Sequence, residues 1–358
     1  MRWDTKLKIN KKIISASDPS YFIADIAANH DGDLGRAKDL IWLAKEAGAD
    51  CAKFQHFIAK KIVSDIGFTG ELSSVSHQSE WKRSVVEIYD QYHTKREWSE
   101  ELHLECEQAD IDFMTTPYDL DAITLMDQLL PAYKIGSGDL TFREIIVAIS
   151  KMNKPVFLAT GASNINEVID AAEIVLDNNS QLCIMQCNTN YTGSTDNFRY
   201  VNLNVLKQFS TVWPNMVLGL SDHTPGHSAV LGAVSLGARV IEKHFTDDNL
   251  RIGPDHKFAL NPVTWRDMVN ATRELENALG DGVKRIEKNE CETVIIQRRA
   301  LRATKDLAPG TKLTASDLES LRPCPENAVS PMQINDVLGK VLGSKLKRGE
   351  HLEWKNLV

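Results

Sequence analysis

The stretches LGLSDHTPGH (residues 218–227) and ARVIEKHFT (residues 238–246) decide the fold of this chain. Each begins with an apolar run and reaches a histidine soon after the run ends, His223 in the first and His244 in the second. A short apolar run bounded by polar and turn residues is typical of a buried parallel strand. The two histidines are therefore expected where two strands end and their loops begin. In an α/β barrel, that edge carries the active site.

The same alternation of strand and helix patterns extends outward over the first 280 residues. The predicted strands are residues 21–26, 51–55, 112–116, 132–137, 155–160, 183–188, 217–222 and 239–244. Amphipathic stretches separate them, and the last of these ends at Gly280, a residue type that commonly terminates helices. Eight such units predict a TIM (β/α)8 barrel. An open doubly wound sheet is the alternative, but no glycine-rich dinucleotide fingerprint follows the first strand.

The connection after the second predicted strand, residues 56–95, is longer and more polar than the other connections. Long loops in compact domains are usually functional or disordered. We interpret this one as a lid or rim element of the barrel.

The sequence changes character after residue 280. We predict a catalytic barrel over residues 1–280, a polar linker over residues 281–296 and a small β-rich domain over residues 297–358. Within the last, the spacing L-x-x-G-x-x-L occurs twice, from Leu307 and from Leu346, and indicates two similar hairpins. A domain of about 60 residues has a marginal core, so we expect it to pack against another surface such as a barrel mouth.

Composition excludes several classes of partner. The net charge of −8 argues against a nucleic-acid or anionic-membrane surface, because both attract a basic face. We find no stretch with the length of a membrane span and no signal-peptide core, and we expect a cytoplasmic protein. Six cysteines without a CxxC pair are interpreted mainly as buried free thiols.

Period-two alternation identifies the side chains that share a face at three strand ends. The pairs are Lys53 with Gln55, Ser221 with His223, and Glu242 with His244, whereas Lys243 faces the other way. Lys134 and Ser137 end the fourth strand and add a second cation and a hydroxyl, which suits an anion pocket.

The two imidazoles predict one bound metal ion. Imidazole ligation favours Mn²⁺ over Mg²⁺, with Co²⁺ as a further alternative. Any one of these side chains is more often structural, and only their convergence on one rim favours a functional site.

The run from Ile23 to Gln55, IADIAANHDGDLGRAKDLIWLAKEAGADCAKFQ, resembles the opening of the sialic acid synthases, which condense phosphoenolpyruvate with N-acetylmannosamine or related sugars. MTTPYD, YKIGSGD, SDHT, EKHFT and GPDHK follow in the order of that family, and the C-terminal part is similar to its SAF (antifreeze-like) domain. The resemblance covers nearly the whole chain and implies a metal-dependent transferase.

The resemblance also implies roles for individual residues. His223 and His244 correspond to the Mn²⁺ ligands, and Glu242 to an acidic residue beside the metal. The residues that correspond to the surroundings of phosphoenolpyruvate are Lys53, Thr116, Lys134, Ser137 and Ser221, and those that resemble sugar contacts are Gln55, Tyr191 and Asp255. Arg322 stands where the SAF domain of a partner subunit reaches into the active site, which implies a homodimer.

Four departures from the family pattern concern the sugar more than phosphoenolpyruvate. Asp25 and Asp139 stand where the family usually has glutamate, and Ala159 replaces a frequent serine. In QCNTNYTG (residues 186–193) either Thr189 or Asn190 replaces an asparagine of the family, and we assign Asn190 and Asp139 to substrate binding.

We therefore expect a sialic-acid-type synthase with Asp25 and Glu242 as its acid/base groups. A Schiff-base aldolase on the same barrel, with Lys53 or Lys134 as nucleophile, is the alternative enzyme. A non-catalytic sugar-binding homologue is the alternative without chemistry.

Overall fold

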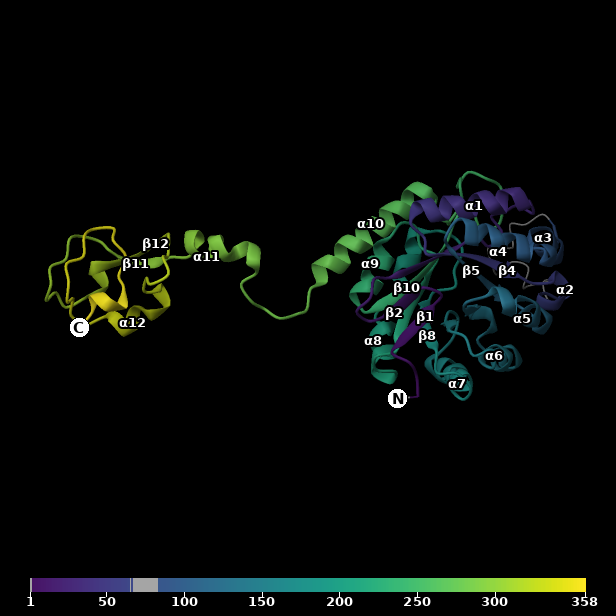
Figure 1. The fold of residues 1–358 in the computed structure, drawn as a ribbon, viewed down its shortest axis with the longest axis horizontal. Helices are drawn as coiled ribbons and strands as arrows, with labels where there is room; N and C mark the ends of the chain where they lie inside the picture. Colours follow the sequence, from purple (N-terminus) through teal and green to yellow (C-terminus); the bar gives the residue numbers. More distant parts are fainter. Residues whose placement is uncertain (1, 65, 67–82) are drawn as a thin grey trace. The chain divides into compact units, whose positions relative to one another are not determined.

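The computed structural model describes residues 2–64, 66 and 83–358, and it divides into two compact units between Gly280 and Asp281. Figure 1 colours the chain from one end to the other.

Eight parallel strands form the centre of the first unit, in the order β5-β4-β3-β10-β9-β8-β7-β6. Their bounds are β3 (Tyr21–Asp25), β4 (Cys51–His56), β5 (Asp112–Pro117), β6 (Tyr133–Ile135), β7 (Val156–Ala159), β8 (Leu182–Cys187), β9 (Val217–Asp222) and β10 (Ala238–His244). Each coincides with a predicted strand to within two residues at either end. The order runs from β5 to β6 around a nearly closed ring, and the predicted TIM-type barrel is confirmed.

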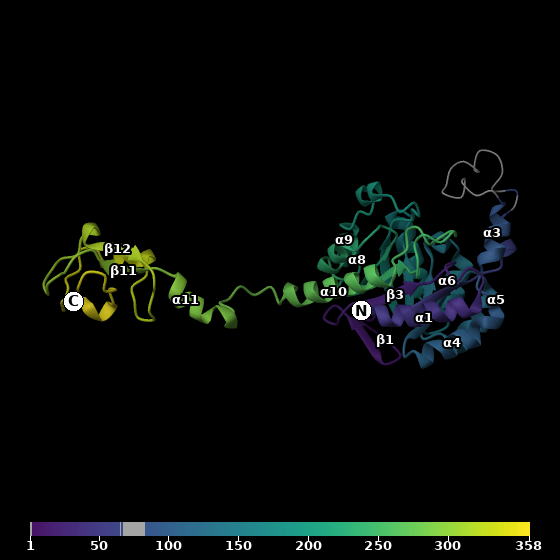
Figure 2. The same cartoon turned by 90° about the horizontal axis from the view of Figure 1, so that it is seen from above.

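Helices surround the strands, as Figure 1 shows. They are α1 (Leu34–Ala47), α2 (Ala59–Ile62), α3 (Val85–Tyr92), α4 (Ser99–Gln108), α5 (Leu120–Met126), α6 (Arg143–Ser150), α7 (Ile165–Leu176), α8 (Val205–Val212), α9 (Ser228–Ser235) and α10 (Pro262–Leu279). Helices α1 and α10 pack side by side, which can be followed in Figure 1 and Figure 2. Among the described residues, no helix has both the length and the apolarity that a membrane span requires.

Helix α1 illustrates why these segments fold as they do. Asp33 caps its first turn by accepting a hydrogen bond from the Arg36 N–H, and Gly48 ends it in the left-handed region at φ 97°. Its buried residues recur at the helical period and include Ala37, Leu40 and Ala44. This apolar stripe packs in the main core between the helices and the sheet.

A short antiparallel hairpin, β1 (Lys6–Ile9) and β2 (Lys12–Ser15), precedes the barrel and was not predicted. Its buried side chains Leu7, Ile9 and Ile14 cluster with residues near the beginnings of several barrel strands, Tyr21 among them. The hairpin therefore packs at the amino ends of the strands, and the carboxyl ends remain for chemistry.

The long connection between β4 and α4 contains α2 and α3. Helix α3 begins with a capping box in which Ser84 and Glu87 bond each other's backbone N–H groups. Most of the remainder, residues 65 and 67–82, lies outside the described part of the chain. The predicted lid or rim element falls partly on these residues.

The second unit contains β11 (Ala300–Ala303), β12 (Leu318–Leu321), α11 (Cys291–Gln297) and α12 (Ile334–Val337). Helix α11 begins within the stretch predicted as a linker. The two L-x-x-G-x-x-L segments are joined by an antiparallel bridge between Leu307 and Leu346, and both leucines are buried in this unit's core. Gly310 and Gly349 turn the two segments at φ 84° and 82°, a conformation that favours glycine.

Four of the six cysteines are buried free thiols, as the sequence predicts: Cys51, Cys106, Cys183 and Cys187. The other two, in the second unit, are exposed or intermediate.

Candidate active site

Ionisable side chains gather at the carboxyl ends of the barrel strands, where the alternation predicts them. In the strand register Asp25 lies opposite both Lys53 and His244, and Glu242 lies opposite Ser221. All five side chains are buried. Charges held away from water at a strand-end rim mark a candidate active site.

Lys53 joins three strands at this rim. Its Nζ lies 2.8 Å from Oδ2 of Asp25 on β3 and 3.3 Å from Oγ1 of Thr116 on β5. The amide of Gln55, two residues further along β4, donates to the same Asp25 oxygen at 3.1 Å. One carboxylate oxygen therefore accepts from two predicted substrate-binding residues, while Oδ1 of Asp25 is buried without a hydrogen-bond partner among the described residues.

Lys134 forms the second buried ion pair. Its Nζ lies 3.2 Å from Oε1 of Glu242, and the two side chains are 3% and 6% exposed. Because β6 and β10 are four positions apart in an eight-strand ring, this contact crosses the barrel interior. Ser221 donates to the same Glu242 oxygen at 3.1 Å. Oε2 of Glu242 has no partner in the described part of the chain.

The two carboxyl groups have opposite pKa shifts. Burial raises the pKa of Asp25, the attraction of Lys53 opposes this, and the negative charge of Glu242 adds to the increase. Burial also disfavours ionisation of Glu242, but attraction from Lys134 and Lys53 outweighs it and the net pKa is lowered. Asp25 is thus the group of the pair that holds a proton more readily.

The two predicted metal ligands lie together, with His223 and His244 ring centroids 5.4 Å apart. Burial, reinforced by the charge of His223, lowers the pKa of His244 well below its usual value, so this imidazole is neutral and can offer a lone pair. Nδ1 of His244 is buried without a hydrogen-bond partner among the described residues.

The pKa of His223 is shifted in the opposite direction from that of His244. Nδ1 of His223 lies 3.0 Å from the carbonyl oxygen of Asn188, to which an Nδ1–H donates. Burial lowers the pKa of His223, but hydrogen bonds with Cys187 and the Asn188 carbonyl raise it and give a net increase. Metal binding at this imidazole would therefore be linked to proton release.

The donor set fits a metal ion only in part. Two imidazole ligands on neighbouring strands suit a transition metal. Within the described residues, however, no group of three or more His, Cys, Asp or Glu side chains could hold a metal ion. A metal held here would take its other ligands from water or substrate, as open catalytic sites do.

Aromatic rings border the two histidines. The Tyr191 ring lies 4.5 Å from the His223 ring and the Phe258 ring lies 4.9 Å from the His244 ring, between centroids. Phe258 was missed by the sequence analysis, although it directly follows the quoted motif GPDHK.

Two further acids at the rim have raised pKa values. Burial raises the pKa of Asp255 to about 6, and its Oδ2 lies 3.8 Å from Nδ1 of His244 and accepts the Ala28 N–H at 3.3 Å. Burial likewise raises the pKa of Asp139 to about 6, and its Oδ2 has no hydrogen-bond partner in the described part of the chain.

The β8 end distinguishes Thr189 from Asn190. The Gly161 N–H donates to Oγ of Ser137 at 3.0 Å, and a Cβ added at Gly161 would lie 1.9 Å from Oγ1 of Thr189. Asn190 is exposed, and its Oδ1 accepts the Thr192 hydroxyl within its own loop at 2.8 Å. Thr189 therefore lies near Ser137, whereas the substrate-binding role of Asn190 stays a prediction.

Arg322 belongs to the second unit. Its side chain is exposed and its Nε–H donates to the carbonyl oxygen of Gln297 at 2.6 Å.

Known protein families match both units of the chain. A model of the NeuB family matches residues 40–284, and a model of the SAF domain matches residues 298–358. The chain is 34% identical to N,N'-diacetyllegionaminic acid synthase from Campylobacter jejuni, covering 92% of this chain and 97% of that protein. It is 30% identical to N-acetylneuraminate-9-phosphate synthase from Homo sapiens, covering 91% and 89%.

A solved structure has the same fold. N-acetylneuraminic acid synthetase from Leptospira borgpetersenii, crystallised with citrate, superposes with a TM-score of 0.70 at 23% identity. The match covers 81% of this chain and 95% of that chain.

Proposed function

This chain belongs to the NeuB family, and on that premise we propose that it is a nonulosonic acid synthase that joins phosphoenolpyruvate to an open-chain 2-acetamido sugar. Relatives that cover more than nine-tenths of the chain are named synthases of such acids, which supports the class of product. The observation that carries the proposal is the pair of buried lysines, Lys53 and Lys134, each balanced by one carboxylate on the same rim.

The lysines account for the binding of phosphoenolpyruvate. An ammonium group has three N–H donors. Lys53 and Lys134 each make two close contacts with described residues. Each therefore has a donor left for a phosphate or carboxylate oxygen. Thr116, Ser137 and Ser221 add hydroxyls around the same anion.

The proposed reaction forms one C–C bond and breaks the C–O bond to phosphate. The methylene carbon of phosphoenolpyruvate bonds to the aldehyde carbon of the sugar, and the aldehyde oxygen takes a proton. Water adds to the resulting cationic carbon and loses a proton. The C–O bond then breaks, the phosphate leaves with its bridging oxygen, and the new hydroxyl becomes a carbonyl by passing its proton to the phosphate. A keto acid and phosphate result.

The opposite pKa shifts assign roles to the two carboxyl groups. Asp25 can donate a proton to the new alkoxide and take one from the water, because its pKa is raised towards the working range. Glu242 remains ionised and stabilises the positive charge that develops on carbon. A divalent ion held by His223 and His244, by preference Mn²⁺, would supply Lewis acidity for the carbonyl when bound.

The pKa of Lys53 argues against this lysine as the nucleophile of the aldolase alternative. Burial lowers it, but Asp25 and Glu242 raise it and the net shift is upward. A Schiff-base lysine needs a lowered pKa so that the free amine is available.

The test is product analysis by mass spectrometry. Phosphoenolpyruvate labelled with ¹⁸O at its bridging oxygen is incubated with Mn²⁺ and a panel of 2-acetamido sugars, with Glu242→Gln as the matched inactive variant. We expect one sugar to give a nonulosonic acid and the label to appear in phosphate. Label retained in the organic product, or a lysine adduct trapped by borohydride, would contradict the mechanism. Absence of product with every sugar would favour a sugar-binding homologue.

We also propose a homodimer in which Arg322 of one subunit completes the sugar site of the other. The resemblance to the sialic acid synthases and the exposure of this arginine support it. Mixing Arg322→Ala with His244→Ala subunits should restore one good site per heterodimer. Verified heterodimers without recovered activity would show that the sites are not shared.

A further inference from the structure

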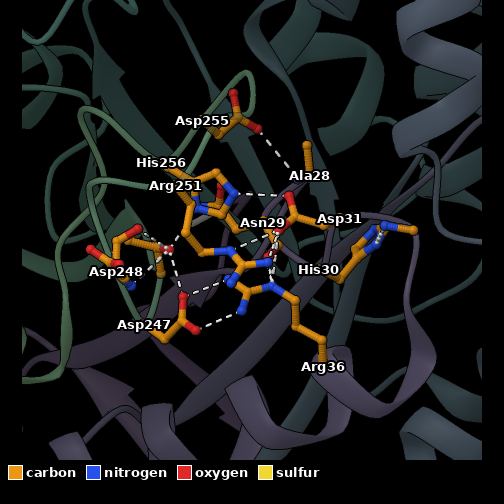
Figure 3. Close-up of polar contacts among 12 residues, drawn as sticks. Ala28, Asn29, His30, Asp31, Arg36, Asp247, Asp248, Arg251, Asp255 and His256 are labelled. Carbon is orange, nitrogen blue, oxygen red and sulfur yellow. Dashed lines mark hydrogen bonds and ion pairs between the residues drawn. The ribbon is translucent and has the colours of Figure 1, made fainter.

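A polar cluster around the buried His256 ties together two loops at the carboxyl end of the barrel, the β3–α1 loop and the β10–α10 loop (Figure 3). At its centre is Asp31, whose Oδ1 lies 2.9 Å from Nε2 of His256 and whose Oδ2 lies 2.8 Å from Nη2 of Arg251. A carboxylate only accepts, so Nε2 of His256 carries a proton. The other ring nitrogen of His256 lies 2.7 Å from the Thr246 hydroxyl, which fixes the orientation of the ring.

Helix α1 anchors both loops through Arg36. Its guanidinium donates to Oδ2 of Asp247 at 2.6 Å, in the β10–α10 loop, and to the carbonyl oxygen of Asn29 at 2.8 Å, in the β3–α1 loop. Its Nε also lies 3.2 Å from Oδ2 of Asp31. An arginine fork that bonds both loops holds them in one arrangement.

Gly253 provides an independent sign that the His256 ring has a fixed place. A Cβ at residue 253 would lie 2.6 Å from Cδ2 of His256 and 3.0 Å from its Nε2. Because the backbone of residue 253 packs directly on the ring, only glycine fits while His256 bonds Asp31.

Asp255 depends on this arrangement. Its carboxylate accepts one long hydrogen bond, from the Ala28 N–H at 3.3 Å, and it lies beside His244. The next residue in the chain is His256, which the cluster fixes. The position of Asp255 therefore follows from contacts made by its neighbour rather than from its own.

We propose that Asp31, through its bond to His256, is a positioning residue that sets Asp255 for the acceptor sugar. The inference rests on the proposed function, which assigns Asp255 to the sugar and the lysines to phosphoenolpyruvate. Asp31 touches neither substrate. Its loss moves the sugar subsite and leaves the anion pocket in place.

The kinetic test uses Asp31→Asn. Residue 31 has φ 54°, a conformation that asparagine tolerates, so the change removes charge without backbone strain. We expect the KM for the sugar to rise about tenfold, since small misplacements cost heavily, and the KM for phosphoenolpyruvate to change less than about twofold. In an Asp255→Asn background the same change should have little further effect. Equal increases in both KM values, or full additivity, would overturn the proposal.

Asp127→Asn is the matched control. Asp127 is a partly exposed carboxylate that pairs with Lys154 at 2.9 Å and accepts the Tyr133 hydroxyl at 2.8 Å, ahead of the amino end of β6. The Asp127→Asn substitution should leave the KM for the sugar and the KM for phosphoenolpyruvate unchanged. If Asp31→Asn fails to fold, Arg251→Gln removes one cation from the cluster at a 41% exposed side chain and should raise the sugar KM about threefold.

Hydrogen exchange gives a readout that needs no activity. Peptides from residues 247–260 should exchange faster in Asp31→Asn than in wild type. In Asp127→Asn their exchange rates should equal those of the wild type. Unchanged exchange in Asp31→Asn would refute the cluster's role even in an active enzyme. Faster exchange in a protein that makes no product would leave the positioning intact and refute the proposed function alone.

Discussion

Replacing Lys134 by methionine tests the cross-barrel ion pair. Methionine resembles the lysine stem but removes the ammonium group that lies 3.2 Å from Glu242. Breaking a buried pair by removing one partner costs about 3–5 kcal/mol, because the other charge stays buried. The Ser221 hydroxyl still donates to Glu242 and Lys53 still attracts it, so we expect the lower end, about 3 kcal/mol.

The double variant Lys134→Met/Glu242→Gln separates stability from function. It removes the stranded charge and should recover about 2 kcal/mol of the loss. It should not recover activity, because the cation assigned to phosphoenolpyruvate is still missing. Loss of a charge-assisted hydrogen bond of about 1.5–3 kcal/mol predicts a decrease in kcat/KM for phosphoenolpyruvate of about 10- to 100-fold in the single variant.

The pH dependence gives a further check. Without Lys134 the pKa of Glu242 rises, so the folded state binds a proton more readily than the unfolded state does. The stability of Lys134→Met relative to wild type should therefore recover as the pH falls from 7 towards 5.

The assay is urea unfolding of the barrel, followed by tryptophan fluorescence, together with steady-state kinetics. If the double variant is no more stable than Lys134→Met, Glu242 is not the charge that Lys134 compensates. An unchanged kcat/KM for phosphoenolpyruvate would refute the assignment of Lys134 to the anion pocket.

Three other predictions concern the same rim. Burial raises the pKa of Asp255 to about 6, so the stability of the wild type falls as the pH rises through about 4 to 6. Asp255→Asn should therefore be about 2–3 kcal/mol more stable than the wild type at pH 7.5 by urea unfolding, and its KM for the sugar should be higher. A less stable variant would contradict this. Gly161→Ala places a Cβ against Thr189 and should lower kcat/KM strongly in steady-state assays, with partial rescue by Thr189→Gly; normal activity of the single variant would refute the close approach. Chelation should abolish turnover, and added Mn²⁺ should restore it. Elemental analysis should show that His223→Ala and His244→Ala have lost the bound metal. Full activity of the demetallated protein would exclude a role of the metal in turnover.

Much of the barrel could be predicted because its signals are local. An apolar run such as residues 217–222 reports a buried parallel strand wherever it lies in the chain, and the residues after it must lie at the carboxyl edge. The hairpin of β1 and β2 escaped prediction because lysines interrupt its short strands, so neither shows the continuous apolar run that marks the barrel strands.

The sequence predicted which side chains lie at the strand ends but not the contacts between them, and their roles stay predictions. Alternation identified Lys53, Glu242 and His244 at the rim, because a strand's period is fixed at two. At the β8 end no regular period applies, and the sequence left both Thr189 and Asn190 open as the replacement; in the structure Thr189 lies near Ser137 and Asn190 is exposed.

The sequence by itself determined the order of strands and helices, the edge that carries the polar residues and the resemblance to a family of synthases. Only the tertiary structure decided that Lys134 meets Glu242 across the barrel, and that Asp31 bonds His256 between two loops. These contacts join residues 108 and 225 positions apart, so no spacing along the chain encodes them. The opposite pKa shifts of Asp25 and Glu242 depend on burial and on distances through space, which exist only once the barrel has closed.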